Sequence, residues 1–216
     1  PEFNGITIDS RKVQKGDIFL ALKGENIDGH HYIEQAQNAG ASICIVEKEG
    51  DRFSSAFEVF STRQFLNDIA TVYRKYLTCP LIGITGTNGK TTTKDLLTHI
   101  LSIDRNVVST KGNYNSTTGV PLSLFEFGED VDMGIIEIGA NKPGEIESIC
   151  QIVQPDMGII TNIFEAHIEY FGTIEMVAET KSALFSSLPE SGTAFVNMDD
   201  MYISKMTVPC NRVEYS

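Results

Sequence analysis

From residue 81 onward, short apolar runs alternate with longer segments whose apolar residues recur at helical spacing. The short runs predict strands, and the longer segments predict amphipathic helices. Strands are expected at residues 81–85, 107–110, 133–138, 157–161 and 193–197, and helices at residues 91–101, 143–153 and 174–188, with Pro143 at a first helical position. This alternation predicts a mostly parallel sheet, and such sheets bind ligands at the carboxyl ends of their strands.

The first part of the chain carries the same pattern in shorter form. Apolar runs at residues 17–22 and 42–46 predict strands, residues 32–39 between them have helical spacing, and Gly40 stands where a helix ends. A helix is predicted over residues 62–77, with Ser61 and Gln64 as a capping box and Pro80 after it. We therefore expect a small N-terminal α/β domain over residues 1–78 and a central α/β domain over residues 79–216.

Composition and charge narrow the class of protein. Of the 216 residues 41% are hydrophobic and 21% are charged, and the net charge is −12. Such a chain folds as a globular protein, offers no basic stripe to a nucleic acid, and contains no apolar run of the ~18 residues that a membrane span needs. The cysteines, Cys44, Cys79, Cys150 and Cys210, lack metal-ligand spacing and are expected to be free thiols, mostly buried. These features predict a cytoplasmic protein.

The strongest chemical signal is the segment G-T-N-G-K-T at residues 86–91, between a predicted strand and a predicted helix. Its glycines let backbone N–H groups turn toward phosphate oxygens, and the helix N-terminus adds partial positive charge. Lys90 would neutralise the β- and γ-phosphates, and Thr91 would offer its hydroxyl to Mg²⁺. Ile84 stands where the full Walker motif has glycine, so a plain glycine turn remains the alternative.

Two further residues follow strands at the same predicted edge of the sheet. Glu137 is a carboxylate in an otherwise apolar strand and needs a cation, which is either a structural partner or Mg²⁺. His167 lies shortly after the strand at 157–161, where a structural role competes with a role in the site. Residues 110–121, rich in amides and hydroxyls, form either a substrate-contacting loop or only a polar one.

Lys181 lies within the apolar stripe of the helix at 174–188. A lysine in such a stripe either extends to solvent or is buried. Burial lowers the pKa of a lysine and leaves a neutral amine, which can react with CO₂ to give an anionic carbamate able to bind a metal. Spacing alone leaves both alternatives open.

Together these segments resemble the Mur ligases, the ATP-dependent enzymes that form the amide bonds of the bacterial peptidoglycan peptide. Residues 86–91 resemble their ATP loop, and residues 9–17 and 28–30 resemble their UDP-recognising first domain. Residues 113–115, 137–145 and 166–167 are most similar to the branch that joins D-Ala-D-Ala to UDP-N-acetylmuramoyl-tripeptide through an acyl phosphate. The resemblance covers nearly the whole chain.

The resemblance implies roles for individual residues. Lys90, Glu137, His167 and Lys181 are the implied catalytic residues, Lys181 at a position that several Mur ligases carbamylate. The implied Mg²⁺ ligands are Thr91, Glu137 and His167. ATP is implied to bind Gly86, Thr87, Asn88, Gly89, Lys90, Thr91 and Thr92, and the UDP-linked substrate to bind Ser10, Arg11, Asn113 and Asn115.

The resemblance also implies a C-terminal ligase domain and a longer central domain than residues 79–216, so we expect these 216 residues alone to be inactive. We also expect a monomer. Two alternatives remain within ATP-dependent ligation, namely a MurE-type and a folylpolyglutamate-type ligase. A third, from another class, is a P-loop kinase or a non-catalytic nucleotide-binding module. Residues 9–17 and 28–30 argue against the third, because a simple kinase does not need them.

Overall fold

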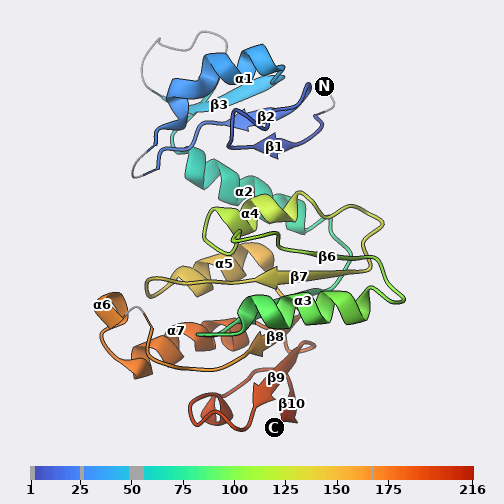
Figure 1. The fold of residues 1–216 in the computed structure, drawn as a ribbon, viewed down its shortest axis with the longest axis vertical. Coiled ribbons are helices and arrows are strands. Elements are labelled where there is room, and N and C mark those ends of the chain that lie inside the picture. The colour runs from blue at the N-terminus through green and yellow to red at the C-terminus, as the bar shows by residue number, and fades with distance from the viewer. Residues whose placement is uncertain (1–2, 25–26, 49–55, 167) are drawn as a thin grey trace. The chain divides into compact units, whose positions relative to one another are not determined.

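The computed structural model describes residues 3–24, 27–48, 56–166 and 168–216. The chain divides into two compact units, Pro1–Ile69 and Ala70–Ser216, and the division falls within helix α2 (Thr62–Arg74) (Figure 1). Both units are α/β, as the sequence predicts. Among the described residues, none of the helices has the length and apolar character needed to cross a bilayer.

The first unit is built on a four-stranded parallel sheet. Its strands, in spatial order, are β1 (Ile6–Thr7), β2 (Ile18–Leu20), β3 (Ile43–Glu47) and β4 (Phe57–Val59). Between β2 and β3 the chain forms the 3-10 helix η1 (Gly29–Tyr32) and helix α1 (Ile33–Ala39). Helix α1 ends at Gly40, whose φ of 104° is left-handed, as the sequence predicts. The core of the first unit contains Phe19, Ala21, Ile33, Ala36, Cys44 and Val46.

The second unit contains a six-stranded sheet in which all paired strands are parallel. Its spatial order is β10-β9-β8-β5-β7-β6. The strands are β5 (Leu81–Thr85), β6 (Val107–Ser109), β7 (Met133–Glu137), β8 (Met157–Ile160), β9 (Thr193–Asn197) and β10 (Asn211–Tyr215). The central strand β5 pairs with β7 on one side and with β8 on the other. The chain therefore changes direction across the sheet at β5, the kind of position where such sheets bind ligands.

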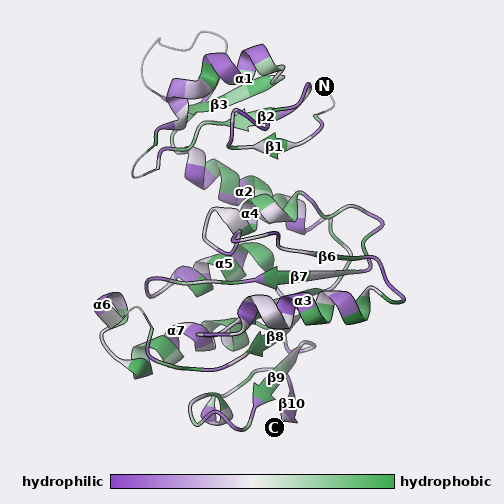
Figure 2. Cartoon of the chain, viewed as in Figure 1, coloured by the Kyte–Doolittle hydropathy of each residue, from purple (hydrophilic) through white to green (hydrophobic). Residues whose placement is uncertain are grey.

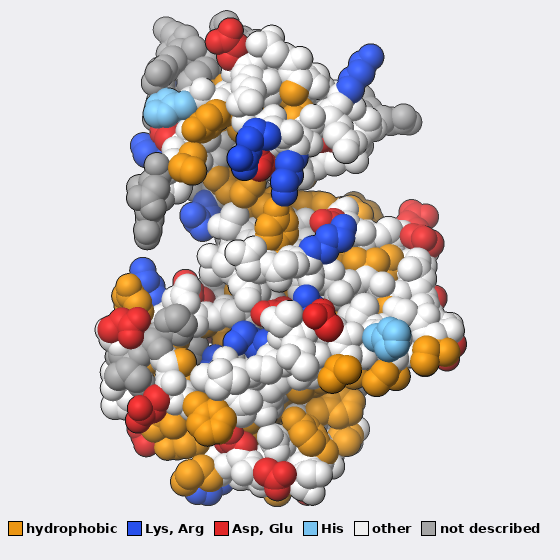
Figure 3. Space-filling model, in the orientation of Figure 1, with side chains coloured by type: hydrophobic (Ala, Val, Ile, Leu, Met, Phe, Trp, Pro, Cys, Tyr) orange, Lys and Arg blue, Asp and Glu red, His pale blue; other side chains and the backbone are white. Residues whose placement is uncertain are grey.

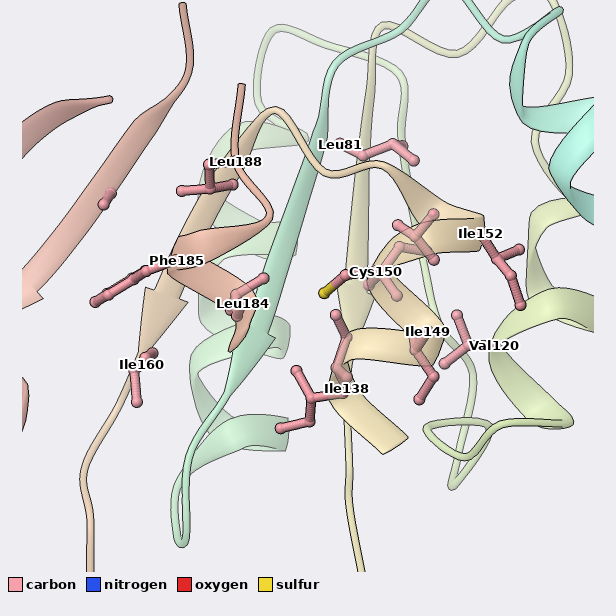
Figure 4. Close-up of a cluster of buried hydrophobic side chains, with 14 of the residues drawn as sticks. Leu81, Val120, Ile138, Ile149, Cys150, Ile152, Ile160, Leu184, Phe185 and Leu188 are labelled. Atoms are coloured by element: carbon pink, nitrogen blue, oxygen red, sulfur yellow. The ribbon is translucent and has the colours of Figure 1, made fainter. Parts of the chain in front are cut away.

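Helices cover both faces of this sheet, so the central strands β5 and β7 are buried along their whole length and mostly apolar, as Figure 2 shows for β7. Helix α3 (Lys90–Leu101) packs on β5, β6 and β7. Helices α5 (Glu145–Val153) and α7 (Ile174–Ser186) cover the other face, and α4 (Gly119–Leu124) packs on α5. The larger core between the sheet and these helices contains Ile138, Ile149, Leu184 and Phe185 (Figure 4). The short helix α6 (Ile168–Phe171) and the 3-10 helix η2 (Ile203–Lys205) complete the unit.

The cysteines are free thiols, as predicted. Cys44, Cys79 and Cys150 are buried, Cys210 is half-buried, and burial raises the pKa of the Cys150 thiol to about 11. Cys150 lies among the apolar side chains of the larger core (Figure 4). These thiols therefore pack as small apolar groups.

Several predicted boundaries are wrong for local reasons. Helix α5 begins at Glu145 and not at Pro143, because Gly144 precedes it in the left-handed conformation at φ 83°. Residues 119–121, the end of the predicted polar loop, begin helix α4, which tolerates Pro121 because the first turn of a helix needs no donor there. The Gln64 N–H donates to Ser61 Oγ at 3.3 Å, but the Gln64 side chain donates to Asp68, so only half of the capping box forms.

Candidate active site

Two glycines shape the loop between β5 and α3. Gly86 has a φ of 147°, and a Cβ atom there would lie 1.9 Å from Thr161 Oγ1, so only glycine fits. Gly89 has a φ of 78° and directly precedes α3, which begins at Lys90. Strand β5 therefore turns at once into the N-terminus of a helix, as the motif predicts.

The first turn of α3 presents donors. Within the described chain, no residue accepts a hydrogen bond from the backbone N–H groups of residues 89–92, whereas the Thr93 N–H donates to Gly89 O at 2.9 Å. Unpaired N–H groups at a helix N-terminus carry partial positive charge and bind phosphate oxygens. The loop therefore has the donors that a polyphosphate requires.

Lys90 lies across this loop. Its Nζ donates to Gly86 O at 2.8 Å and to Thr87 O at 2.9 Å. Burial lowers the pKa of the Lys90 ammonium, and the nearby Glu137 carboxylate opposes that shift. The cation is thus held over the loop by two carbonyl oxygens, which an incoming phosphate can replace.

Glu137 ends β7 and is 3% exposed. Its Oε2 accepts from Thr91 Oγ1 at 2.9 Å and its Oε1 accepts from Asn115 Nδ2 at 2.8 Å. The structure thereby brings together four residues that the sequence singled out: Glu137, Thr91, Asn115 and, through its charge, Lys90. A carboxylate and a hydroxyl are the hard oxygen ligands that Mg²⁺ prefers, so these residues fit that ion.

The loop after β8, residues 161–164, holds the phosphate loop from the other side. Asn162 receives the Asn88 N–H on its Oδ1 at 3.0 Å and the Thr87 N–H on its backbone oxygen at 2.9 Å. Thr161 Oγ1 donates to Asn88 O at 2.6 Å, and Thr87 Oγ1 exchanges hydrogen bonds with the backbone of Phe164. The conformation of the phosphate loop therefore depends on this neighbouring loop.

Lys181 is buried, at 5% exposure, on α7. Within the described chain its ammonium makes no hydrogen bond or ion pair. Burial, and secondarily the charge of Lys90, lower its pKa to about 8. Of the two alternatives that spacing left open, the structure selects burial, so a substantial fraction of this amine is neutral near pH 8.

His167 lies outside the described residues, so its predicted place in the site stays a prediction. Without it, no group of three histidine, cysteine, aspartate or glutamate side chains able to hold a metal occurs among the described residues. A metal at Thr91 and Glu137 would therefore depend on phosphate oxygens and water for further ligands.

The remaining candidate substrate residues differ in exposure. Asn113 is exposed in the loop after β6. In the first unit, Ser10 is buried and its Oγ donates to Gln35 Oε1 at 2.9 Å. Arg11 is exposed, and its guanidinium binds Asp9 through two hydrogen bonds, which lower the pKa of that carboxyl to about 2. The Ser10 hydroxyl is therefore already engaged, whereas Arg11 remains open to solvent.

In the segment 28–30 of the first unit, the side chains of Asp28 and His30 make hydrogen bonds within the protein. The buried His30 contacts Asp28 Oδ1 through Nδ1 at 2.6 Å, and its Nε2 accepts the Glu47 N–H at 2.9 Å. These contacts fix the imidazole as the Nδ1–H tautomer. The pair thus ties η1 to the end of β3.

Comparison with known proteins places this geometry in a family. Residues 84–214 match the family model described as the Mur ligase middle domain, and residues 2–76 match the model described as the Mur ligase family, catalytic domain. The chain belongs to the Mur ligase family.

Its similar relatives are MurF proteins. The UDP-N-acetylmuramoyl-tripeptide–D-alanyl-D-alanine ligase of Synechocystis is 38% identical over 91% of this chain and 44% of its own length. The enzyme of the same name from Escherichia coli is 36% identical over 91% of this chain and 44% of its length. This Mur ligase chain is therefore a MurF homologue that spans about half the length of the curated relatives it matches.

Solved structures of MurF proteins are also similar to this chain. A crystal structure of MurF from Acinetobacter baumannii superposes with a TM-score of 0.91 at 33% identity, covering 98% of this chain and 48% of that one. MurF ligase from Thermotoga maritima in complex with ADP gives a TM-score of 0.87 at 34% identity, covering 97% of this chain and 49% of that one. The α/β architecture of this Mur ligase chain is thus that of the MurF structures over the matched half.

Two further residues of this Mur ligase support the site: Lys94, for which no role was predicted, and Thr110, the first residue of the predicted polar loop. Lys94, one turn beyond Lys90, is 4% exposed, and its Nζ donates to Thr110 O at 2.8 Å. Thr110 Oγ1 in turn accepts the N–H of Glu137 at 3.0 Å. A signal for Lys94 existed in the sequence, because it shares a helical face with Lys90, Leu97 and Leu101.

Proposed function

We propose that this chain forms the substrate- and ATP-binding half of an ATP-dependent ligase that joins D-Ala-D-Ala to UDP-N-acetylmuramoyl-tripeptide in bacterial peptidoglycan synthesis. The observation that carries the proposal is the convergence of Lys90, Thr91 and Glu137 at the carboxyl ends of parallel strands in a MurF homologue. The names of its curated relatives state this activity for them.

The two parts of the chain take different substrates. Residues 1–78 bind the UDP-muramoyl-peptide, with Ser10 and Arg11 as contacts, and residues 79–216 bind ATP. The exposed Arg11 guanidinium suits an anionic substrate, since arginine pairs with phosphate and carboxylate oxygens. Asn113 and Asn115, in the loop after β6, contact the peptide end of that substrate.

ATP binds the phosphate loop, residues 86–92. The unpaired N–H groups of residues 89–92 donate to phosphate oxygens, and Lys90 moves its ammonium from the loop carbonyls to the β- and γ-phosphates. The complex of a MurF homologue with ADP supports this assignment. Thr91 and Glu137, together with His167, would hold Mg²⁺, which when bound would screen the negative charge of the phosphates.

The reaction proceeds in two displacements. A terminal carboxylate oxygen of the tripeptide attacks the γ-phosphorus, the bond from that phosphorus to the β–γ bridging oxygen breaks, and ADP leaves. The amine nitrogen of D-Ala-D-Ala then attacks the acyl carbon of the acyl phosphate, phosphate leaves, and the nitrogen loses a proton. Lys90 and the N–H groups of the loop stabilise the charge that develops on the transferred phosphoryl group.

As a carbamate, Lys181 adds a negative charge that offsets the positive charge of Lys90. The ammonium first loses one proton, and the neutral amine then attacks CO₂: a C–N bond forms, the electron pair of one C=O π bond moves onto oxygen, and a second proton leaves the nitrogen, so a buried cation becomes an anion. The position of Lys181 close enough to Lys90 to lower its own pKa supports this role, because a carbamate would turn that repulsion into attraction.

Nucleotide binding to the 216-residue chain tests the proposal. Calorimetry should detect ADP and Mg-ATP binding, and Lys90→Ala should weaken it by about 10- to 100-fold, since hydrogen bonds to charged groups contribute about 1.5–3 kcal/mol. Lys75→Ala, which removes an exposed lysine preceding β5, is the matched control and should bind as wild type does. Absence of nucleotide binding by the wild-type chain would refute the assignment.

A further inference from the structure

The loop that supports the phosphate loop, residues 161–164, is itself held by two side chains at the carboxyl end of β9. Asp200 Oδ2 accepts the Ile163 N–H at 2.7 Å, and Asn197 Nδ2 donates to Thr161 O at 2.9 Å. The Ile163 side chain is 3% exposed and packs in the larger core. Loop 161–164 is therefore clamped between the phosphate loop and residues 197–200.

The Asp200 carboxylate is fixed in one orientation. While Oδ2 faces Ile163, Oδ1 accepts the N–H of Tyr202 at 2.9 Å and the N–H of Ile203 at 3.0 Å, where η2 begins. Rotation of the carboxylate would break at least one of these three charge-assisted bonds. Because the carboxylate cannot rotate freely, the position of the Ile163 N–H depends directly on the position of the chain at the end of β9.

The connection from Asp200 to the phosphate loop is short. The peptide that carries the Ile163 N–H also carries the backbone oxygen of Asn162, which accepts the Thr87 N–H, and the Asn162 side chain binds both the N–H and the oxygen of Asn88. Because a peptide group is planar and rigid, a shift at Ile163 N moves Asn162 O with it. A displacement at Asp200 therefore reaches Thr87 and Asn88 through one peptide unit.

We propose that Asp200 is a positioning residue for the phosphate loop, acting through Ile163 and Asn162 without touching the nucleotide. The inference rests on the proposed function only in assigning a nucleotide to the loop; the mechanical link is independent of the ligand. It follows that the end of strand β9 sets the positions of the N–H groups that bind phosphate. Small displacements of such groups weaken binding.

Asp200→Asn separates this role from general stability. The asparagine oxygen can still accept from Tyr202 and Ile203, but its NH₂ group then faces the Ile163 N–H, so donor meets donor. Asp199→Asn makes the same chemical change one residue earlier on an exposed side chain and is the matched control. Asn197→Ala removes the second clamp by a different chemistry, and it decides the question if Asp200→Asn does not fold.

Hydrogen exchange on the ligand-free chain gives the first readout. In Asp200→Asn the N–H groups of Ile163, Thr87 and Asn88 should exchange about tenfold faster or more, in line with the loss of a bond to a charged group, while those of β7 and α5 stay at wild-type rates. Asp199→Asn should match wild type throughout. Wild-type rates at residues 87–88 would overturn the proposal, and so would an equal acceleration across the whole second unit, since Asp200 would then serve overall stability.

Affinity for ADP gives the second readout. The dissociation constant should rise by about tenfold in Asp200→Asn, as expected when binding donors are misplaced, and remain unchanged in Asp199→Asn. Unchanged affinity together with unchanged exchange at residues 87–88 would refute the inference. If the wild-type chain itself bound no ADP, the proposed function would fail, whereas the exchange rates would still decide whether Asp200 positions the loop.

Discussion

At the scale of single residues, we expect Glu137 to determine how strongly Mg²⁺ increases the affinity of the site for ATP. Its carboxylate lies between Thr91 and Asn115, both neutral, so Glu137→Gln keeps the shape and most of the hydrogen bonding while it removes the charge. We expect the gain in ATP affinity that Mg²⁺ provides to fall by about 10- to 100-fold, a range typical for metal-site substitutions. Without Mg²⁺, the variant should bind ATP at least as well as wild type, because one repulsive charge is gone.

Calorimetric titration with ATP, with and without Mg²⁺, measures both effects. Glu147→Gln, on the exposed face of α5, is the control and should leave the Mg²⁺ dependence intact. An equal dependence on Mg²⁺ in wild type and Glu137→Gln would exclude Glu137 as a ligand.

Lys181 gives the site a dependence on pH. Burial lowers the pKa of its ammonium to about 8, so the neutral amine becomes the major form as pH rises through 8, whereas an exposed lysine, with a pKa of about 10.4, stays almost wholly charged there. In ¹³C-labelled bicarbonate at pH 8, NMR should show one carbamate signal that is missing in Lys181→Met. The signal should weaken toward pH 6.5 as the amine is protonated. A signal that persists in Lys181→Met would assign it to another amine.

The sequence anticipated the charged and hydroxyl residues of the site better than their partners. Lys90, Thr91 and Glu137 follow from one rule, that residues after parallel strands meet at one edge of the sheet. That Asn115 donates to Glu137 could not be read from spacing, because the path of the loop between them depends on helix α4. The contacts by which Asp28 and His30 hold η1 against β3 could not be read from spacing either, and their place in substrate recognition stays a prediction.

At the scale of elements, a buried arginine ties helix α2 to the sheet. The Arg74 guanidinium donates to the backbone oxygens of Leu77, Val153 and Gln154 and to Asp156, whose carboxylate also accepts the N–H of Leu81. Arg74→Met should lower the free energy of unfolding by about 3 kcal/mol, because several buried acceptors lose their donor together. Urea denaturation measures the change.

Two further variants test this prediction more closely. Arg74→Lys should recover little of the stability, since an ammonium cannot reproduce the planar fork of donors. Arg105→Met removes an exposed ion pair with Asp104 and should change the free energy of unfolding by less than about 1 kcal/mol. A small loss in Arg74→Met would show that water replaces the guanidinium at this position.

Elements with strong periodicity were predictable, and those determined by pairing were not. Strands β5 and β9 have the predicted bounds, because their apolar runs end at residues with turn chemistry. Strands β1 and β4 are too short to show a period, and β10 is an exposed edge strand with polar residues. Only pairing with neighbouring strands makes these three segments extended.

At the scale of the whole molecule, the net charge limits the kinds of partner that the protein can bind. On the face of the second unit shown in Figure 3, lysine and arginine side chains are few and lie among carboxylates. The net charge of −12 argues further against a nucleic-acid partner. The proposed anion site of this acidic molecule is therefore local, made by backbone N–H groups and Lys90.

The 216-residue chain should bind nucleotide without completing ligation. It spans about half the length of its curated relatives, and the amine of D-Ala-D-Ala must be placed against the acyl phosphate, a task for which the described residues offer no assigned site. We expect no phosphate release that depends on D-Ala-D-Ala when the chain is mixed with ATP and UDP-N-acetylmuramoyl-tripeptide. Release that requires the dipeptide, and that a diamino acid or glutamate does not support, would contradict this expectation and show that these residues suffice.

The position of β5 in its sheet has a consequence for biosynthesis. Both strands that hydrogen-bond to β5 come later in the chain, β7 ending at Glu137 and β8 at Ile160. A chain made from its N-terminus therefore leaves the ribosome with the buried strand β5 unpaired on both edges until residue 137 has emerged, and on one edge until residue 160 has emerged. We therefore expect the strand that leads into the proposed nucleotide site to be exposed to pairing with other chains while the protein is being made.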